Sequence, residues 1–218
     1  MSAPNASDPG TPGRWSKVAP LLGLLFVVFV VASVVVSNTP RTNASPASIL
    51  RFYQSHQGRI QVGSFLGAPA VVLGLFWFAY LRNWLQRHDV HERWGTVTFA
   101  GGILFAVVGG VATGTQFALV DTPKNLTEST AVALNFLSGD LPFLLSSMAF
   151  GVMATAAGIA MIKSRALPTW LGWFSLVIGI LGALPVGDFF ALPAIGIWTL
   201  IVVGTMWFRT DPDGRLAP

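Results

Sequence analysis

The chain has 218 residues, of which 53% are hydrophobic and only 10% are charged. Since a soluble globular domain carries about 25% charged residues, this composition excludes an ordinary soluble domain and leaves room for one membrane bundle. Cysteine is absent, which excludes disulfides, iron–sulfur clusters, thiolate zinc sites and cysteine nucleophiles. The net charge of +4 comes from Lys and Arg at the ends of apolar stretches, which favours anionic lipid headgroups and not nucleic acid as the partner.

Six long uncharged stretches follow one another along the chain, and each has about the ~20 residues that a helix needs to cross a bilayer. We therefore predict an all-α fold, a polytopic membrane helical bundle with six transmembrane helices. The predicted spans are residues 18–36, 60–81, 95–120, 141–162, 166–187 and 189–208. In an alternative interpretation the first stretch is a signal peptide cleaved near residues 35–37, which would leave five spans.

The segments outside the spans are short and polar. Residues 1–13, rich in Pro, Gly, Ser and Asn, cannot bury a core and are predicted to be a disordered cytoplasmic leader. The bundle occupies residues 14–209, and residues 210–218 form a cytoplasmic tail. Two short interfacial helices are predicted on the outer side, one beginning at Ser45 and Pro46 and one over residues 127–137 with Thr127 as its N-cap.

The basic residues predict the orientation of the bundle. Nine of the 13 Lys and Arg residues fall in the N-terminal segment, the second and fourth loops and the tail, which would all lie on one side. The positive-inside rule places that side, and with it both termini, in the cytoplasm. Most tryptophans stand near the same ends of the spans, where an amphipathic indole is favoured.

Small residues recur at four-residue spacing on two of the predicted spans. The row in the third span consists of Gly102, Ala106, Gly110 and Gly114, and Gly63 and Gly67 repeat the pattern in the second. Because lipid tails are as apolar as leucine, helices in a bilayer associate through such close-packing faces. We interpret these residues as helix-packing positions within the bundle; alternatively, one face forms a homodimer seam or lines a narrow path.

Polar residues converge at the predicted outer ends of the helices. They define a candidate outer vestibule made of Arg59, Gln61, Gln116, Asp121, Asn135, Asp140 and Asp188. One hypothesis pairs Arg59 with Asp140 or Asp188. The alternatives are structural: an N-cap for Asp140, a turn for Asp188 and a snorkelling anchor for Arg59.

The spans themselves offer little chemistry. No ionisable residue lies well inside any span, whereas ion-coupled transporters and proton pumps keep such residues there. The stretch from His88 to Glu92, with Asp89 and His91, is the only cluster of metal-ligand residue types. Its two histidines can share a helix face, but a catalytic zinc would need a third protein ligand. We therefore predict no catalytic residue, no metal site and no cofactor.

Three motifs resemble those of a known class of proteins. They are ALPTWLGWFS at residues 166–175, GAP at residues 67–69 and FAYLR at residues 78–82. Together they resemble an uncharacterised family of actinobacterial integral membrane proteins, over about residues 15–209. The resemblance implies a membrane bundle in a bacterial plasma membrane and brings no activity with it.

Three function classes follow. The favoured one is a non-enzymatic membrane component, such as a scaffold, an envelope-homeostasis protein or the partner of another membrane protein, in contact with lipids and able to form a homo-oligomer. The second is a small transporter, channel or lipid-binding bundle that uses Thr113, Thr115 and Gln116 as its polar groups. The least favoured is a membrane-embedded enzyme. A water-filled cavity that reaches Gln116 would favour the second class.

Overall fold

The computed structural model describes residues 15–40, 43–88, 93–121, 125–165, 167–184 and 188–209, without the side chains of residues 15–18, 88, 188–192 and 209. The predicted leader and tail lie outside these residues. Within the described part the fold is all helical, as the sequence predicts. The helices are α1 (Trp15–Ser37), α2 (Pro46–Ser55), α3 (Gln57–His88), α4 (Arg93–Asp121), α5 (Glu128–Ser138), α6 (Asp140–Ser164), α7 (Thr169–Ala183) and α8 (Asp188–Arg209).

Four helical segments are long and apolar enough to cross a membrane. They are Ala19–Ser37, Gln57–Arg87, Arg93–Asp121 and Glu128–Ser164. Two shorter apolar helices follow, Thr169–Ala183 and the part of α8 whose side chains are described, Pro193–Phe208. The fifth predicted span is too long at its C-terminal end. Leu184 is extended, with φ −85° and ψ 146°, because it precedes Pro185, and proline disfavours helical geometry in the residue before it.

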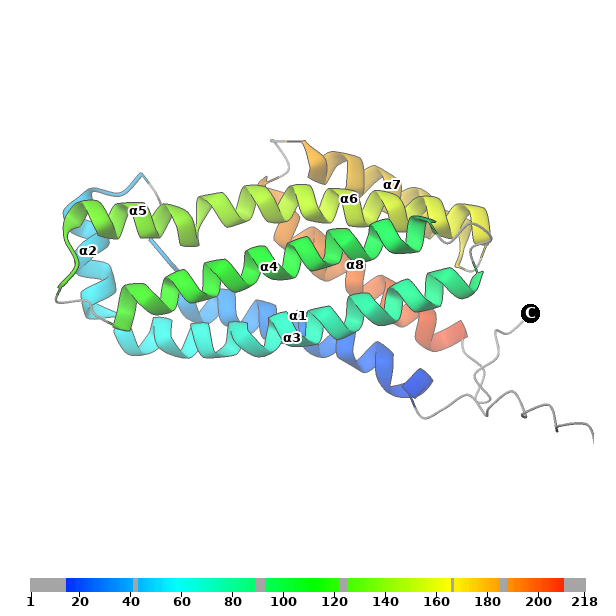
Figure 1. Cartoon of the computed structure of the whole chain (residues 1–218), viewed down its shortest axis with the longest axis horizontal. Helices are drawn as coiled ribbons and strands as arrows, with labels where there is room; N and C mark the ends of the chain where they lie inside the picture. Colours follow the sequence, from blue (N-terminus) through cyan, green and yellow to red (C-terminus); the bar gives the residue numbers. More distant parts are fainter. Residues whose placement is uncertain are drawn as a thin grey trace, which may run out of the picture.

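Helix α5 differs from the expected interfacial helix. It runs in line with α6, so that both lie along the long axis of the bundle (Figure 1), and the two form one apolar segment of 37 residues. Gly139 separates them with φ −112° and ψ −93°. A helical segment of that length spans about 55 Å, more than the ~30 Å of a hydrocarbon core, so α5 extends the bundle beyond the length that a single span needs.

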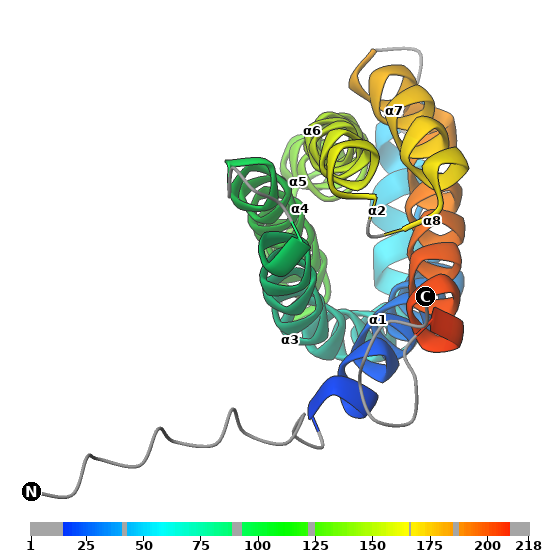
Figure 2. The same ribbon diagram turned by 90° about the vertical axis from the view of Figure 1, so that its right-hand side faces the viewer.

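The first four long helices pack in chain order, and α7 and α8 lie on one side of them. Helix α1 contacts α3 and α8, α3 contacts α4, α4 contacts α6, and α6 contacts α7 (Figures 1 and 2). The α6–α7 contact is close because glycines face each other's backbone: a Cβ added at Gly151 would lie 2.7 Å from the Ala183 nitrogen.

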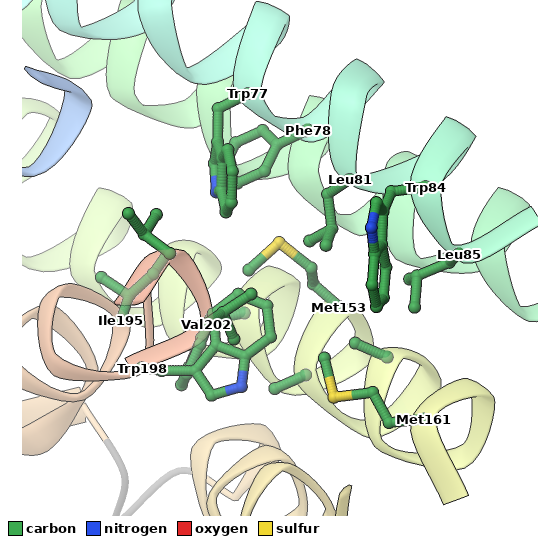
Figure 3. Close-up of a cluster of buried hydrophobic side chains, with 14 of the residues drawn as sticks. Trp77, Phe78, Leu81, Trp84, Leu85, Met153, Met161, Ile195, Trp198 and Val202 are labelled. Atoms are coloured by element: carbon green, nitrogen blue, oxygen red, sulfur yellow. The ribbon is translucent and has the colours of Figure 1, made fainter. Parts of the chain in front are cut away.

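Two apolar clusters hold the described residues together. In the larger one, side chains of α3, α6 and α8 face one another, among them the fully buried Trp77, Met153 and Trp198 (Figure 3). The Trp198 indole nitrogen donates a 2.8 Å hydrogen bond to the Ser175 hydroxyl of α7, which satisfies the only polar atom of that side chain. The smaller cluster contains Ile49 of α2 and residues of α3, α4 and α5.

Candidate functional site

A cavity of about 410 Å³ lies between α1, α3, α4 and α6; we call it the interior cavity. Its apolar wall includes Phe26, Val30, Ala70, Phe105 and Ala106. Its polar groups come from all of these helices except α3 and include Ser33, Ser37, Thr113, Gln116, Asp140 and Ser146. The cavity is therefore apolar along most of its wall, with polar groups at the end near α5.

Small side chains create this space. Gly109 of α4 lines the cavity, and a Cβ added there would meet no atom within 4 Å. Gly67 of α3 lies where the helices do touch, since a Cβ at that position would lie 2.7 Å from the Thr113 hydroxyl oxygen. The two helices thus approach closely at Gly67 and leave a void beside Gly109.

The polar groups of the cavity are only partly satisfied by the protein. Ser33 donates to the Gly63 carbonyl and Thr113 to the Gly109 carbonyl, each at 2.8 Å. The Ser37 hydroxyl is buried without a hydrogen-bond partner among the described residues. Gln116 is half-buried in the cavity wall, and no described group pairs with its side-chain amide. An amide offers two donors and an acceptor, so this end of the cavity can hydrogen-bond a polar occupant.

Of the predicted vestibule residues whose side chains the structure describes, two line this cavity, Gln116 and Asp140. The exposed side chains of Gln61 and Asp121 lie elsewhere on α3 and α4. For Asp188 the structure describes the backbone, at the start of α8, but not the side chain.

Arg59 makes a different contact from the hypothesised ion pair. Its guanidinium donates hydrogen bonds to the Val36 carbonyl at 2.6 Å and the Val35 carbonyl at 3.3 Å. These are carbonyls of the last turn of α1, where a helix carries partial negative charge and orphan acceptors. Arg59 therefore caps α1, and in the described part of the chain it forms no ion pair with Asp140.

Asn135 belongs to a separate contact between α2 and α5. The hydroxyl of the fully buried Tyr53 donates a 2.7 Å hydrogen bond to its side-chain oxygen. Burial raises the pKa of Tyr53 to about 12, against an opposing hydrogen bond from Ser138. This buried pair joins the two short helices, and neither Tyr53 nor Asn135 lines the cavity.

The predicted packing row on α4 meets three different surroundings. A Cβ at Gly102 would lie 2.5 Å from the Phe78 ring, Ala106 lies in the cavity wall, and a Cβ at Gly114 would meet nothing within 4 Å. A Cβ added at Gly110 would lie 4.0 Å from a methyl carbon of Val71. On α3, Gly63 packs against Ser37.

A second cavity of about 780 Å³ lies between α1, α6 and α8 and is almost entirely apolar. Its lining residues are Val27, Val30, Val31, Val34, Val35, Asp140, Phe143, Pro193, Gly196, Ile197 and Leu200. We call it the lateral groove. It shares Val30, Val34, Asp140 and Phe143 with the first cavity, so the two spaces adjoin.

A protein-family model described as a domain of unknown function, DUF4386, matches residues 21–209. The chain belongs to the DUF4386 family. No curated protein and no solved structure matches it. The family domain contains every residue that lines the interior cavity and the lateral groove, so both belong to the DUF4386 domain itself.

The metal-ligand types of the sequence do not assemble in the described part of DUF4386. Among the described residues, no group of three His, Asp or Glu side chains could hold a metal ion. The side chain of His88 and the whole of His91 lie outside the described residues. Sequence reasoning missed Gly109 and Ser37 as cavity residues, because neither a lone glycine nor a lone serine signals a void.

Proposed function

We propose that this protein is a multi-pass protein of a bacterial plasma membrane whose bundle binds one small neutral amphiphile in the interior cavity. The observation that carries the proposal is the cavity itself. Its volume of about 410 Å³ falls within the ~300–1,000 Å³ of ligand pockets, which are mostly apolar with a few convergent polar groups. Because the cavity reaches Gln116, it favours the binding or transport class over the scaffold class.

Six spans with both termini in the cytoplasm are part of the same proposal. Four segments have the required length and apolarity, and the 22 residues of α8 would extend about 33 Å. Helix α7, with 15 residues, would extend about 22 Å, a shortfall that local bilayer thinning and flanking residues accommodate. Figure 1 places the start of α1 and the end of α8 at the same end of the bundle, as an even number of spans requires.

The charges around the cavity disfavour an anionic ligand, and the only carboxylate, that of Asp140, lies in the first turn of α6, where the helix N-terminus offsets its charge without a cationic ligand. No Lys or Arg occurs among the described residues that line it, and Asp140 is the only ionisable one. An anionic group inside would be desolvated without a partner, which is costly. Hydroxyls and amides, in contrast, match Ser33, Thr113 and Gln116.

Filling the cavity tests the proposal. Gly109→Leu places a side chain in the cavity without an initial clash, and Gly114→Leu is the matched control because it meets nothing and does not line the cavity. A ligand present at 100 times its Kd stabilises a protein by about 2.7 kcal/mol. Monobutyrin, a short neutral amphiphile, should therefore raise the Tm of the wild type and of Gly114→Leu in detergent, and should leave that of Gly109→Leu unchanged. An equal shift in all three proteins would contradict the proposal.

A second candidate, association with another copy or another membrane protein, is supported by the outer part of α4. Gly114 is exposed, and the described residues leave the space beside it open, as a close helix–helix contact requires. The oligomeric mass of Gly114→Leu in detergent tests it. A shift from a multimer to a single chain would support association, and an unchanged mass would exclude this face as the seam.

A further inference from the structure

We propose that the occupant is a bilayer lipid with a neutral, hydroxyl-bearing head and a long acyl chain, of the acylglycerol class. Its head occupies the interior cavity, its chain occupies the lateral groove, and it enters sideways between α1 and α8. This inference rests on the proposed function and adds the identity and route of the ligand.

The groove is built to receive an apolar chain. Six of its large apolar side chains are exposed, and the exposed fraction reaches 53% for Val31, 65% for Val35 and 55% for Ile197; the other three are Val34, Phe143 and Leu200. Gly196 contributes no side chain, which leaves room between α1 and α8. Such a face would be an aggregation hazard in water, whereas in a bilayer it is a contact surface for acyl chains.

The length of the groove matches one leaflet. On α1 it extends from Val27 to Val35, a distance of about 12 Å along a helix axis. Half of a ~30 Å hydrocarbon core measures about 15 Å. The groove occupies the C-terminal half of α1, which is the half near Asp140, so it serves one leaflet only. With both termini cytoplasmic, this is the outer leaflet.

Continuity with the cavity joins the two parts of the ligand. Val30, Val34 and Phe143 line both spaces, so a chain in the groove leads directly to the polar groups at the cavity end. A free water-soluble ligand would need no such apolar extension. A diffusing lipid needs it, because its chain stays in the hydrocarbon while its head is bound.

The polar end selects the head. Ser33, Thr113 and Gln116 present hydroxyl and amide groups, and no described Lys or Arg lines either space. A phosphate head would lose its hydration without gaining a cation. Glycerol hydroxyls can donate to and accept from the groups present.

Blocking the groove while leaving the cavity open tests this inference. A Cβ at Gly196 would lie 3.7 Å from a methyl carbon of Val27, an ordinary contact, so Gly196→Leu fills the groove without a backbone clash. Gly204→Leu on the same helix is the control, because a Cβ there meets nothing and the residue does not line the groove. The probe is a monoacylglycerol with a diazirine in its acyl chain, in phosphatidylcholine nanodiscs, with labelled peptides identified by mass spectrometry.

We expect photolabelling of the groove segments of α1 and α8 in the wild type and in Gly204→Leu, and at least a tenfold loss in Gly196→Leu. The Tm shift by monobutyrin, which needs only the cavity, should persist in Gly196→Leu. Undiminished labelling of Gly196→Leu would overturn the inference, as would equal competition by phosphatidylglycerol or crosslinking of a second protein chain to the groove. If monobutyrin shifts no variant, the proposed function itself fails.

Discussion

The contact between α6 and α7 leads to the sharpest prediction about stability. A Cβ at Gly179 would lie 2.5 Å from the backbone nitrogen of Thr155 and 3.0 Å from the Gly151 carbonyl oxygen. Real Cβ contacts essentially never fall below 3.0 Å, and both neighbours are backbone atoms of a packed helix. Gly179→Ala therefore forces α7 away from α6.

The magnitude follows from the lost packing. A gap of 0.5–1 Å forfeits about a quarter to a half of the dispersion energy of the facing atoms, and overpacked sites typically cost about 1–3 kcal/mol. Gly114→Ala is the matched control, since its Cβ meets nothing. It should instead stabilise its helix by about 0.5–1 kcal/mol, because glycine loses more backbone entropy than alanine.

The two substitutions should thus change stability in opposite directions. Equilibrium unfolding in mixed micelles with increasing denaturing detergent measures both. If Gly179→Ala were as stable as Gly114→Ala, the close α6–α7 contact would not exist and the packing argument would be refuted.

Three further predictions concern Tyr53 and Arg59. Tyr53→Phe leaves the buried Asn135 amide without its partner and should cost about 1–3 kcal/mol of unfolding free energy. Asn135→Leu should cost less in the Tyr53→Phe protein than in the wild type. An equal cost in both proteins would show that the pair does not interact. Because the pKa of Tyr53 is raised to about 12 from 10.0, the native state favours the neutral phenol, so the wild type should lose stability as the pH rises from about 10 to 12 and Tyr53→Phe should lack that loss. Arg59→Ala removes the cap of α1 and should lower the unfolding free energy by about 0.3–1 kcal/mol, measured by the same unfolding in mixed micelles. Arg59→Lys keeps the charge and should recover part of this loss. Equal stability of the two variants would exclude a charge effect.

Local features of the sequence predict much of the fold. The runs of apolar residues identify the long helices, and Thr127 caps α5 as expected, accepting a hydrogen bond from the Thr130 nitrogen at 3.3 Å. The alignment of α5 with α6 could not be predicted in this way. Glycine and proline near a helix start allow either a sharp turn or a small offset, and tertiary packing decides between them.

The candidate site was less accessible to sequence reasoning. The sequence predicts Gln116 as a polar group of a pore or pocket near the end of the third span, and Gln116 does line the cavity. The charge of Arg59 suggests an ion pair with a carboxylate, whereas its guanidinium donates hydrogen bonds to backbone carbonyls at the end of α1. A void depends on the spacing of helices that are distant in the sequence, and no pattern along one helix encodes it.

Native mass spectrometry of the wild-type protein, extracted together with its surrounding lipids, tests the central claim most directly. The account predicts a reproducible added mass of one neutral lipid per chain, lost when Gly109 is replaced by leucine. A bare chain, or an added mass that survives the filling of the cavity, would contradict it.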